Sequence, residues 1–119
     1  MITLKTLAQA TTQEVFNQIT AHLLKQNEKS MVGLGCAYRS ELLGLKCAAG
    51  CLISDTEYTK EMDEGESGWD NLIEKELVPS TVHDQLIIGL QYVHDCVPAY
   101  QWSMVLKNYA DNNNLEWNF

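Results

Sequence analysis

Positive charge is scarce in this chain, and it is nowhere clustered. The 119 residues include seven lysines and one arginine against 16 acidic residues, which gives a net charge of −8. Proteins that bind nucleic acid directly need grouped lysine and arginine side chains to neutralise phosphates. Because no such group is present, we expect no direct contact with DNA or RNA.

Long hydrophobic runs are also missing. No uninterrupted apolar stretch approaches the ~20 residues that a membrane-spanning helix requires. The first residues, MITLKTLAQATTQEVF, lack the charged start and apolar core of a signal peptide. We therefore expect a cytoplasmic protein that has no membrane partner. In that compartment the four cysteines stay reduced, which favours packed thiols over disulfides.

Neither repeats nor linker-like segments divide the chain, so we expect a single domain over residues 1–119. An apolar share of 45% is enough for a core that needs no metal or disulfide. The hydrophobic pattern predicts an α+β fold, a small antiparallel β-hairpin packed by about four helices. The hairpin covers residues 31–47, and the helices cover residues 11–25, 69–77, 80–97 and 99–112.

Local signals set the expected ends of these elements. Thr11 followed by Glu14 is a capping box that opens the first helix. By the same spacing, Ser67 is expected to cap the second helix and Thr81 to cap the third, and Val82 is expected on the apolar face of the third helix. The last residues, 115–119, alternate in polarity and are expected to lie extended.

Alternating polarity predicts one strand from Val32 to Tyr38. Residues 40–44 then turn the chain back, and residues 45–47 pair as a short second strand. Residues 48–53 either extend that strand or form a short helix. We favour the helix, because paired alanines are poor strand formers.

The acidic residues are concentrated between residues 55 and 76, where nine carboxylates face two lysines and contribute −7 of the total charge. A field of this kind can steer a basic partner protein. The alternative is a solvated surface that only keeps the protein soluble. Tryptophan and phenylalanine often anchor such contacts, so the candidate partner-binding residues are Glu61, Asp63, Glu64, Glu66, Trp69, Trp117 and Phe119. If Trp117 and Phe119 do not pack within the chain, the tail is a docking element. The molecule that it docks to can be a partner protein or, in a homodimer, a second copy of the chain.

Three of the four cysteines fall in one block, CAYRSELLGLKCAAGCLI. We interpret Cys36, Cys47 and Cys51 as structural thiols. Arg39 is interpreted as the partner of a carboxylate in the acidic segment, held in a two-pronged pair. The alternative is a zinc site, in which Cys36, Cys47 and Cys51 are joined by His94 or Cys96. No pair shows the C-x-x-C spacing typical of structural zinc sites.

A reactive thiol is the other form of a cysteine-centred function, and it requires a nearby imidazole or cation. We expect His83 and His94 at the surface or its boundary, about 16 Å apart along one helix. Neighbouring residues on a helix face different directions, so Asp95 is not expected to orient His94. With no catalytic set assembled, we expect no enzyme and no cofactor.

The chain resembles a family of small uncharacterised bacterial and phage proteins. The resemblance lies in QEVFNQITAHLLKQ, in CAYR followed by GLKCAAGCLI, in Tyr58 with Glu61 and Met62, and in the His-Asp pair followed by Pro98 and Trp102. It implies a phage or prophage source, and therefore the cytoplasm of a bacterial or infected host cell. Small acidic phage proteins frequently bind a host protein, so it also favours a modulator or inhibitor of a host or defence protein.

We therefore expect a non-enzymatic, acidic protein-binding module whose partner has a basic surface. A mimic of nucleic acid that occupies a DNA-binding protein is a special case of this function. The rival hypothesis is a cysteine-centred protein that binds zinc or carries a reactive thiol.

Overall fold

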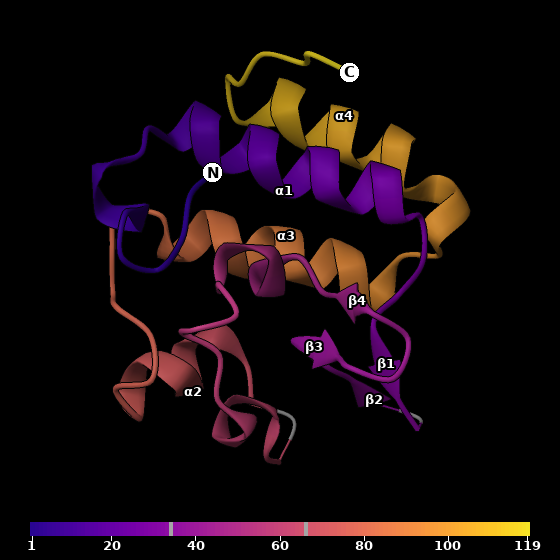
Figure 1. Cartoon of the computed structure of the whole chain (residues 1–119). Helices are drawn as coiled ribbons and strands as arrows, with labels where there is room; N and C mark the ends of the chain where they lie inside the picture. Colours follow the sequence, from indigo (N-terminus) through magenta and orange to yellow (C-terminus); the bar gives the residue numbers. More distant parts are fainter. Residues whose placement is uncertain (34, 66) are drawn as a thin grey trace.

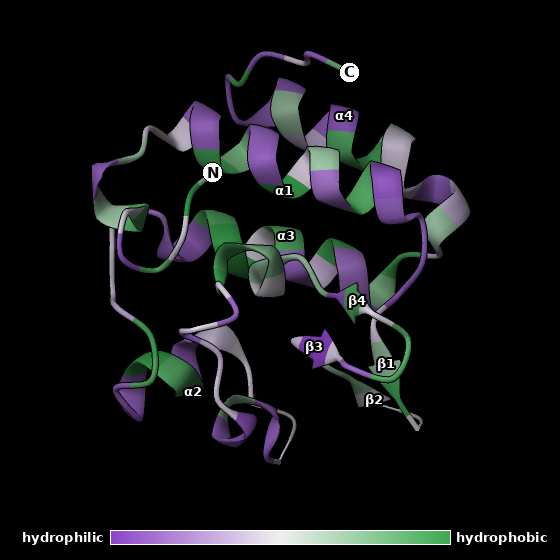
Figure 2. Cartoon of the chain, in the orientation of Figure 1, coloured by the Kyte–Doolittle hydropathy of each residue, from purple (hydrophilic) through white to green (hydrophobic). Residues whose placement is uncertain are grey.

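Three helices form the main layer of the structure, a computed structural model that describes residues 1–33, 35–65 and 67–119. They are α1 (Thr12–Gln26), α3 (Asp84–Cys96) and α4 (Trp102–Asn112), and each contacts the other two (Figure 1). Along α1 and α4, hydrophobic and hydrophilic residues alternate as they do in helices with one buried face (Figure 2). Among the described residues, no helix is both long and apolar enough to cross a membrane.

The first turn of α1 is fixed by the predicted capping box. The Thr11 hydroxyl accepts the Glu14 N–H at 3.1 Å, and the Glu14 carboxylate accepts the Thr11 N–H at 2.8 Å. These hydrogen bonds lower the pKa of Glu14. The helix ends at Asn27, whose φ of 51° is left-handed. Its buried face is the stripe expected from the sequence, Val15, Phe16, Ile19 and Leu23.

The predicted α+β fold is confirmed, and its β-structure consists of two short antiparallel ribbons instead of one hairpin. Strand β3 (Arg39–Ser40) pairs with β4 (Leu45–Lys46) in antiparallel register, so the predicted turn over residues 40–44 is confirmed. The single strand predicted from Val32 to Tyr38 is wrong. The chain turns back after β1 (Met31–Val32), where Gly33 has a φ of 63°, and pairs with β2 (Gly35–Cys36). The positive φ permits a turn that an alternating pattern does not reveal.

The predicted short helix after β4 is present as the 3-10 helix η2 (Ala49–Leu52), which packs against α1 and α3. A Cβ at Gly50 would collide with the backbone carbonyl oxygen of Tyr38. Only glycine allows η2 to approach the segment just before β3 this closely. A further 3-10 helix, η1 (Leu7–Gln9), precedes α1.

The acidic segment forms a lobe below the helical layer, built on the 3-10 helix η3 (Lys60–Asp63) and on α2 (Trp69–Glu74) (Figure 1). The expected Ser67 cap on α2 is wrong, because the N-cap is Gly68 and no side chain caps it. The Ser67 hydroxyl instead donates to the Glu64 carbonyl and accepts from the Lys75 ammonium.

The start of α3 is only partly as expected. The Asp84 carboxylate accepts the Thr81 N–H at 3.0 Å, but the residue at the N-cap is His83. Val82, expected on the apolar face, is 88% exposed because it lies in the turn before the helix begins. After α3, Pro98 is the N-cap of the 3-10 helix η4 (Ala99–Gln101), which leads into α4.

Candidate functional site

Residues 55–76 are called the acidic lobe from here on. Its carboxylates fall into two groups. One group is half-buried and accepts hydrogen bonds from neighbouring segments of the chain. The other faces solvent and consists of Asp55, Glu61, Glu64, Asp70, Glu74 and Glu76. Glu66 lies outside the described residues.

Asp63 belongs to the first group, which corrects the expectation that it contacts a partner. Its carboxylate accepts the N–H of Tyr38 at 2.7 Å, the N–H of Arg39 at 3.2 Å and the hydroxyl of Tyr58 at 2.6 Å. Burial, together with this hydrogen bond and the charge of Asp63, raises the pKa of Tyr58. Asp63 therefore links the acidic lobe to β3, and both of its carboxylate oxygens are engaged within the chain.

Glu57 performs the same task toward the N-terminal segment. Its carboxylate accepts the backbone N–H groups of Leu4, Lys5 and Ser54 at 3.0 to 3.1 Å. Partial burial pushes the pKa of Glu57 upward, but these hydrogen bonds outweigh it and lower the pKa overall. The sequence alone suggests that Glu57 is part of a charged surface. In the structure its carboxylate instead holds the N-terminal segment against the acidic lobe.

Arg39 pairs with the acidic lobe as predicted, but not in two-pronged fashion. One guanidinium nitrogen lies 3.0 Å from an oxygen of Asp55. A second nitrogen donates to the Ile53 carbonyl at 3.3 Å instead of to the same carboxylate. The guanidinium carbon also lies 4.5 Å from the centre of the Tyr58 ring, a cation–π contact.

The aromatic candidates do not gather on the surface. Trp69 is 1% exposed, so the expectation that it contacts a partner is wrong: it fills the core beneath α2. Trp117 packs on Phe16 with ring centres 6.5 Å apart, and Phe119, 47% exposed, meets Trp117 edge to face.

The C-terminal tail that carries these rings is docked along α1. The Gln13 amide donates to the Glu116 carbonyl at 3.0 Å and accepts the Glu116 N–H at 2.8 Å. The tail backbone is thus hydrogen-bonded to α1, and Trp117 packs on Phe16 of the same chain. A docking element was expected only if these aromatic residues did not pack within the chain, and that is not the case.

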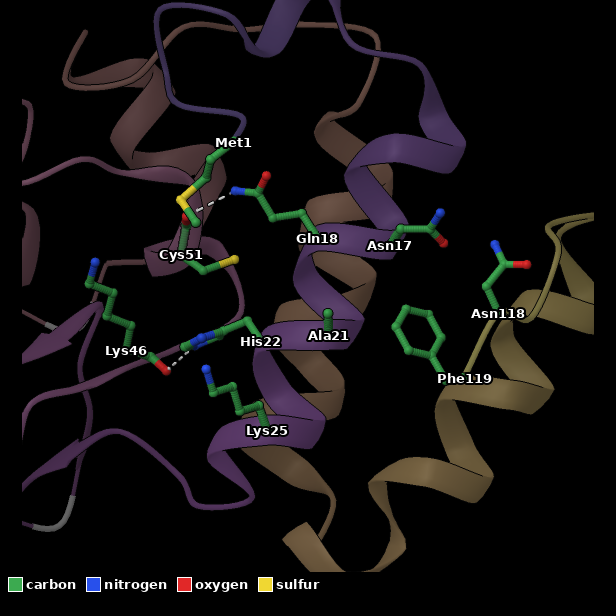
Figure 3. Close-up of a pocket in the computed structure, with 10 residues that line it drawn as sticks. All are labelled: Met1, Asn17, Gln18, Ala21, His22, Lys25, Lys46, Cys51, Asn118 and Phe119. Carbon is green, nitrogen blue, oxygen red and sulfur yellow. Dashed lines mark hydrogen bonds between the residues drawn. The ribbon is translucent and has the colours of Figure 1, made fainter.

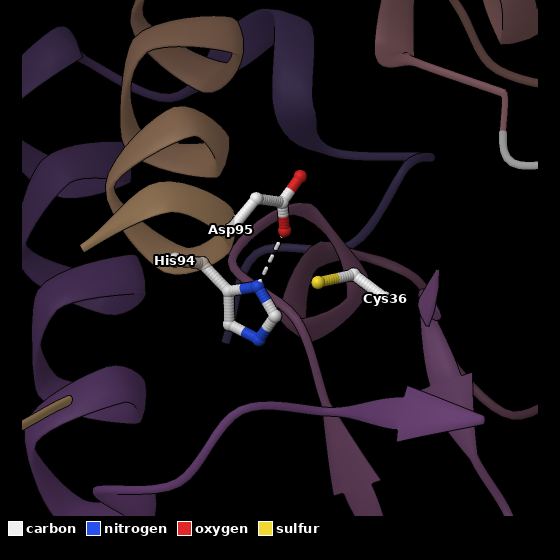
Figure 4. A group of neighbouring side chains, drawn as sticks. All are labelled: Cys36, His94 and Asp95. Atoms are coloured by element: carbon white, nitrogen blue, oxygen red, sulfur yellow. Dashed lines mark hydrogen bonds and ion pairs between the residues drawn. The ribbon is translucent and has the colours of Figure 1, made fainter. Parts of the chain in front are cut away.

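Cys36, His94 and Asp95 converge between β2 and the end of α3, with their possible ligand atoms all within 4.8 Å of one another (Figure 4). The expectation that His94 lies at the surface is wrong, since its exposure is 0%. Asp95 also orients it, contrary to expectation, because its carboxylate oxygen lies 2.7 Å from His94 Nδ1. Gln91, one turn earlier, donates to the same oxygen at 2.9 Å and holds Asp95 in this rotamer.

Both ring nitrogens of His94 are occupied. Nε2 lies 3.0 Å from the Ser30 backbone nitrogen, which can only donate, so Nε2 accepts and the proton sits on Nδ1, facing Asp95. Neither nitrogen has a free lone pair for a metal ion or for the Cys36 proton. Burial, the negative charge of Asp95 and a hydrogen bond with it raise the pKa of the Cys36 thiol to about 11.

The four zinc ligands considered from the sequence are not assembled. Among the residues that the structure describes, the group with metal-ligand geometry is Cys36, His94 and Asp95, without Cys47 or Cys51. The buried Cys47 sulfur accepts the Gly50 N–H at 3.3 Å, and Cys51 donates to the Ala48 carbonyl at 3.2 Å. Burial raises the pKa of Cys47 well above its usual value and that of Cys51 to about 12.

His83 is buried as well, at 2% exposure, which corrects its expected surface position. Its Nε2 donates to the Ala10 carbonyl at 2.8 Å, so it joins η1 to the start of α3.

Comparison of the chain with models of known protein families, with curated proteins and with solved structures found no match.

Proposed function

We propose that the protein is a non-enzymatic binding module whose acidic lobe contacts a basic surface of a partner protein. One observation carries this proposal: exposed carboxylates project from a lobe whose backbone is held by two half-buried ones, Asp63 and Glu57. Glu61 and Glu64 are exposed on either side of Asp63, and the Asp63 side chain accepts three hydrogen bonds.

The rigidity of this frame supports a role in recognition. A partner that binds a flexible acidic loop must first order it, and that ordering weakens binding. Here the ribbon, η3 and the N-terminal segment are joined through Asp63 and Glu57 before any partner arrives. Exposed charge on a fixed frame favours fast, steered association with a surface of opposite sign.

The cysteine cluster supports the non-enzymatic part of the proposal. A thiol nucleophile needs a base to take its proton, and the His94 nitrogens are already engaged by Ser30 and Asp95. The resemblance to bacterial and phage proteins favours a cytoplasmic host or defence protein as the partner that is modulated or inhibited. A DNA-binding protein is included, since its basic surface is already shaped for anionic groups.

A charge-reversal experiment tests this function. Immobilised protein is incubated with bacterial lysate and washed from about 0.1 M to about 0.5 M salt, a range over which surface electrostatics weaken. The test variant is Glu61→Lys with Glu64→Lys. The matched control is Glu28→Lys with Asp111→Lys, which makes the same change in net charge at exposed positions outside the acidic lobe.

We expect one partner to be retained by the wild type and by the control variant, released by salt and lost with the test variant. Binding that both double variants reduce equally would show that only total charge matters. Recovery of no salt-sensitive partner at all would also overturn the proposal.

A further inference from the structure

A groove of about 680 Å³ lies over the outward face of α1, away from the acidic lobe (Figure 3). Ala21 is exposed on this face and forms its floor. Phe119 of the tail stands on one side of Ala21, and His22 and Lys46 stand on the other, with Met1 above. The volume is in the range of small-molecule sites in proteins, roughly 300 to 1,000 Å³.

The wall of the groove formed by the N-terminal segment and η2 is fixed to α1 by the Gln18 side chain. Its amide donates to the carbonyls of Ile2 and Cys51 at 2.8 and 3.2 Å, and its oxygen accepts the Ile2 N–H at 2.7 Å. One side chain thus joins the N-terminal segment and η2 to the same helix. The groove is therefore formed before a ligand enters it.

The backbone of Lys46 is held just as firmly. His22 Nε2 and the Gln26 amide both donate to the Lys46 carbonyl, at 2.9 and 2.7 Å, and the Lys46 N–H donates to Gln26 at 3.0 Å. Burial, with a contribution from the charge of Lys46, lowers the pKa of His22 despite its bond to the carbonyl. A lowered pKa favours the neutral imidazole, so the charge of the groove comes from lysine.

The charge of the groove is opposite to that of the chain. Acidic residues outnumber basic ones two to one in the sequence, yet none of the ten lining side chains is acidic and two, Lys25 and Lys46, are cationic. A second hollow of about 470 Å³, next to β4, is lined by the same two lysines and by His22. Lys25 and Lys46 therefore line both hollows, beside a surface that is otherwise largely apolar.

We propose that this groove binds a small amphipathic carboxylate. The carboxylate pairs with the ammonium groups of Lys25 and Lys46, and the hydrocarbon body lies over Ala21 beside Met1 and Phe119. Apolar contact supplies affinity along the groove, and the lysines select the sign of the head group. This site is independent of the acidic lobe and of the partner proposed for it.

Decanoate is the probe, and decanol, with the same chain length and no charge, is its matched control. Binding to the full chain is measured by calorimetry and by amide chemical shifts. We expect decanoate to bind with shifts at Ala21 and Lys46, and decanol to bind at least tenfold more weakly, the loss of one charge-assisted contact. The variant Lys25→Ala with Lys46→Ala is expected to remove that preference, whereas Lys5→Ala with Lys107→Ala, outside the groove, keeps it.

A second variant tests the site without touching its charges. Ala21→Trp fills the floor, and because Ala21 is exposed the change does not disturb the core. We expect it to abolish decanoate binding while Ala21→Ser preserves it. The proposal is overturned if decanoate fails to bind at millimolar concentration, if decanol binds equally well, or if the Ala21→Trp variant binds like the wild type.

Discussion

Replacing Asp63 with alanine removes the acceptor of three hydrogen bonds at once, those from the backbone of Tyr38 and Arg39 and from the Tyr58 hydroxyl. A hydrogen bond to a charged group contributes about 1.5–3 kcal/mol, but bonds that share one carboxylate are not additive. Asp63 is also half-buried, so water replaces part of what is lost. We therefore expect the free energy of unfolding to fall by about 3 kcal/mol.

Urea unfolding followed by tryptophan fluorescence measures this loss, because Trp69 and Trp102 are fully buried. In a domain of this size the same change lowers Tm by roughly 10 °C. The control is Glu64→Ala, one position away and exposed, for which we expect a change within about 0.5 kcal/mol. The Asp63→Asn variant, which retains one acceptor oxygen, is expected to fall between the two.

Equal stability of the Asp63→Ala and Glu64→Ala variants would refute the division of the acidic lobe into structural and solvent-facing carboxylates. A double-mutant cycle of Asp63→Ala with Tyr58→Phe locates the cause. Phenylalanine keeps a ring for Arg39 and loses only the hydroxyl bond, so we expect a coupling of about 1 kcal/mol.

Two further predictions follow from the pKa shifts. Hydrogen bonds lower the pKa of Glu57 below the ordinary glutamate value in the folded state, so its stabilisation is fully present above that value and is lost as the pH falls below it. The stability difference between wild type and Glu57→Gln, measured by urea unfolding, should therefore shrink on acidification from about pH 5. A difference that stays constant would contradict the role of Glu57 in holding the N-terminal segment. For Cys36, a pKa of about 11 predicts alkylation by iodoacetamide at pH 8 on the order of 100-fold slower in the folded than in the unfolded protein, with the exposed Cys96 as the internal marker in mass spectrometry; fast labelling of Cys36, or stoichiometric zinc in elemental analysis, would restore the rival cysteine-centred function.

The parts of the fold that the sequence predicts are those set by neighbours along the chain. Thr11 and Glu14 lie three residues apart, so their capping box depends on local geometry alone, and the stripe on α1 reflects helical spacing. The turn at Gly33 was missed because glycine allows a positive φ without requiring it. The residues next to a glycine in the sequence do not determine whether it adopts a positive φ.

The candidate site was harder to predict because its chemistry depends on contacts across the chain. Composition shows that the acidic lobe is charged, but not that Asp63 and Glu57 meet backbone donors 24 to 53 residues away. Neighbouring side chains on a helix usually point in different directions, yet His94 and Asp95 are paired. A hydrogen bond from the Gln91 amide holds the Asp95 side chain in a rotamer close to the imidazole ring. Such rotamer choices follow from tertiary packing.

Gly50 connects the two surfaces described above. It is pressed against the carbonyl of Tyr38, whose N–H is bonded to Asp63, and it precedes Cys51, whose carbonyl is bonded to Gln18 beside the groove on α1. A bulky residue at this single position would push apart the supports of both surfaces. In a mutational scan, substitutions at position 50 would then reduce binding of two unrelated ligands, although Gly50 contacts neither. The shared defect would reflect one structural support common to both surfaces and not communication between the two sites.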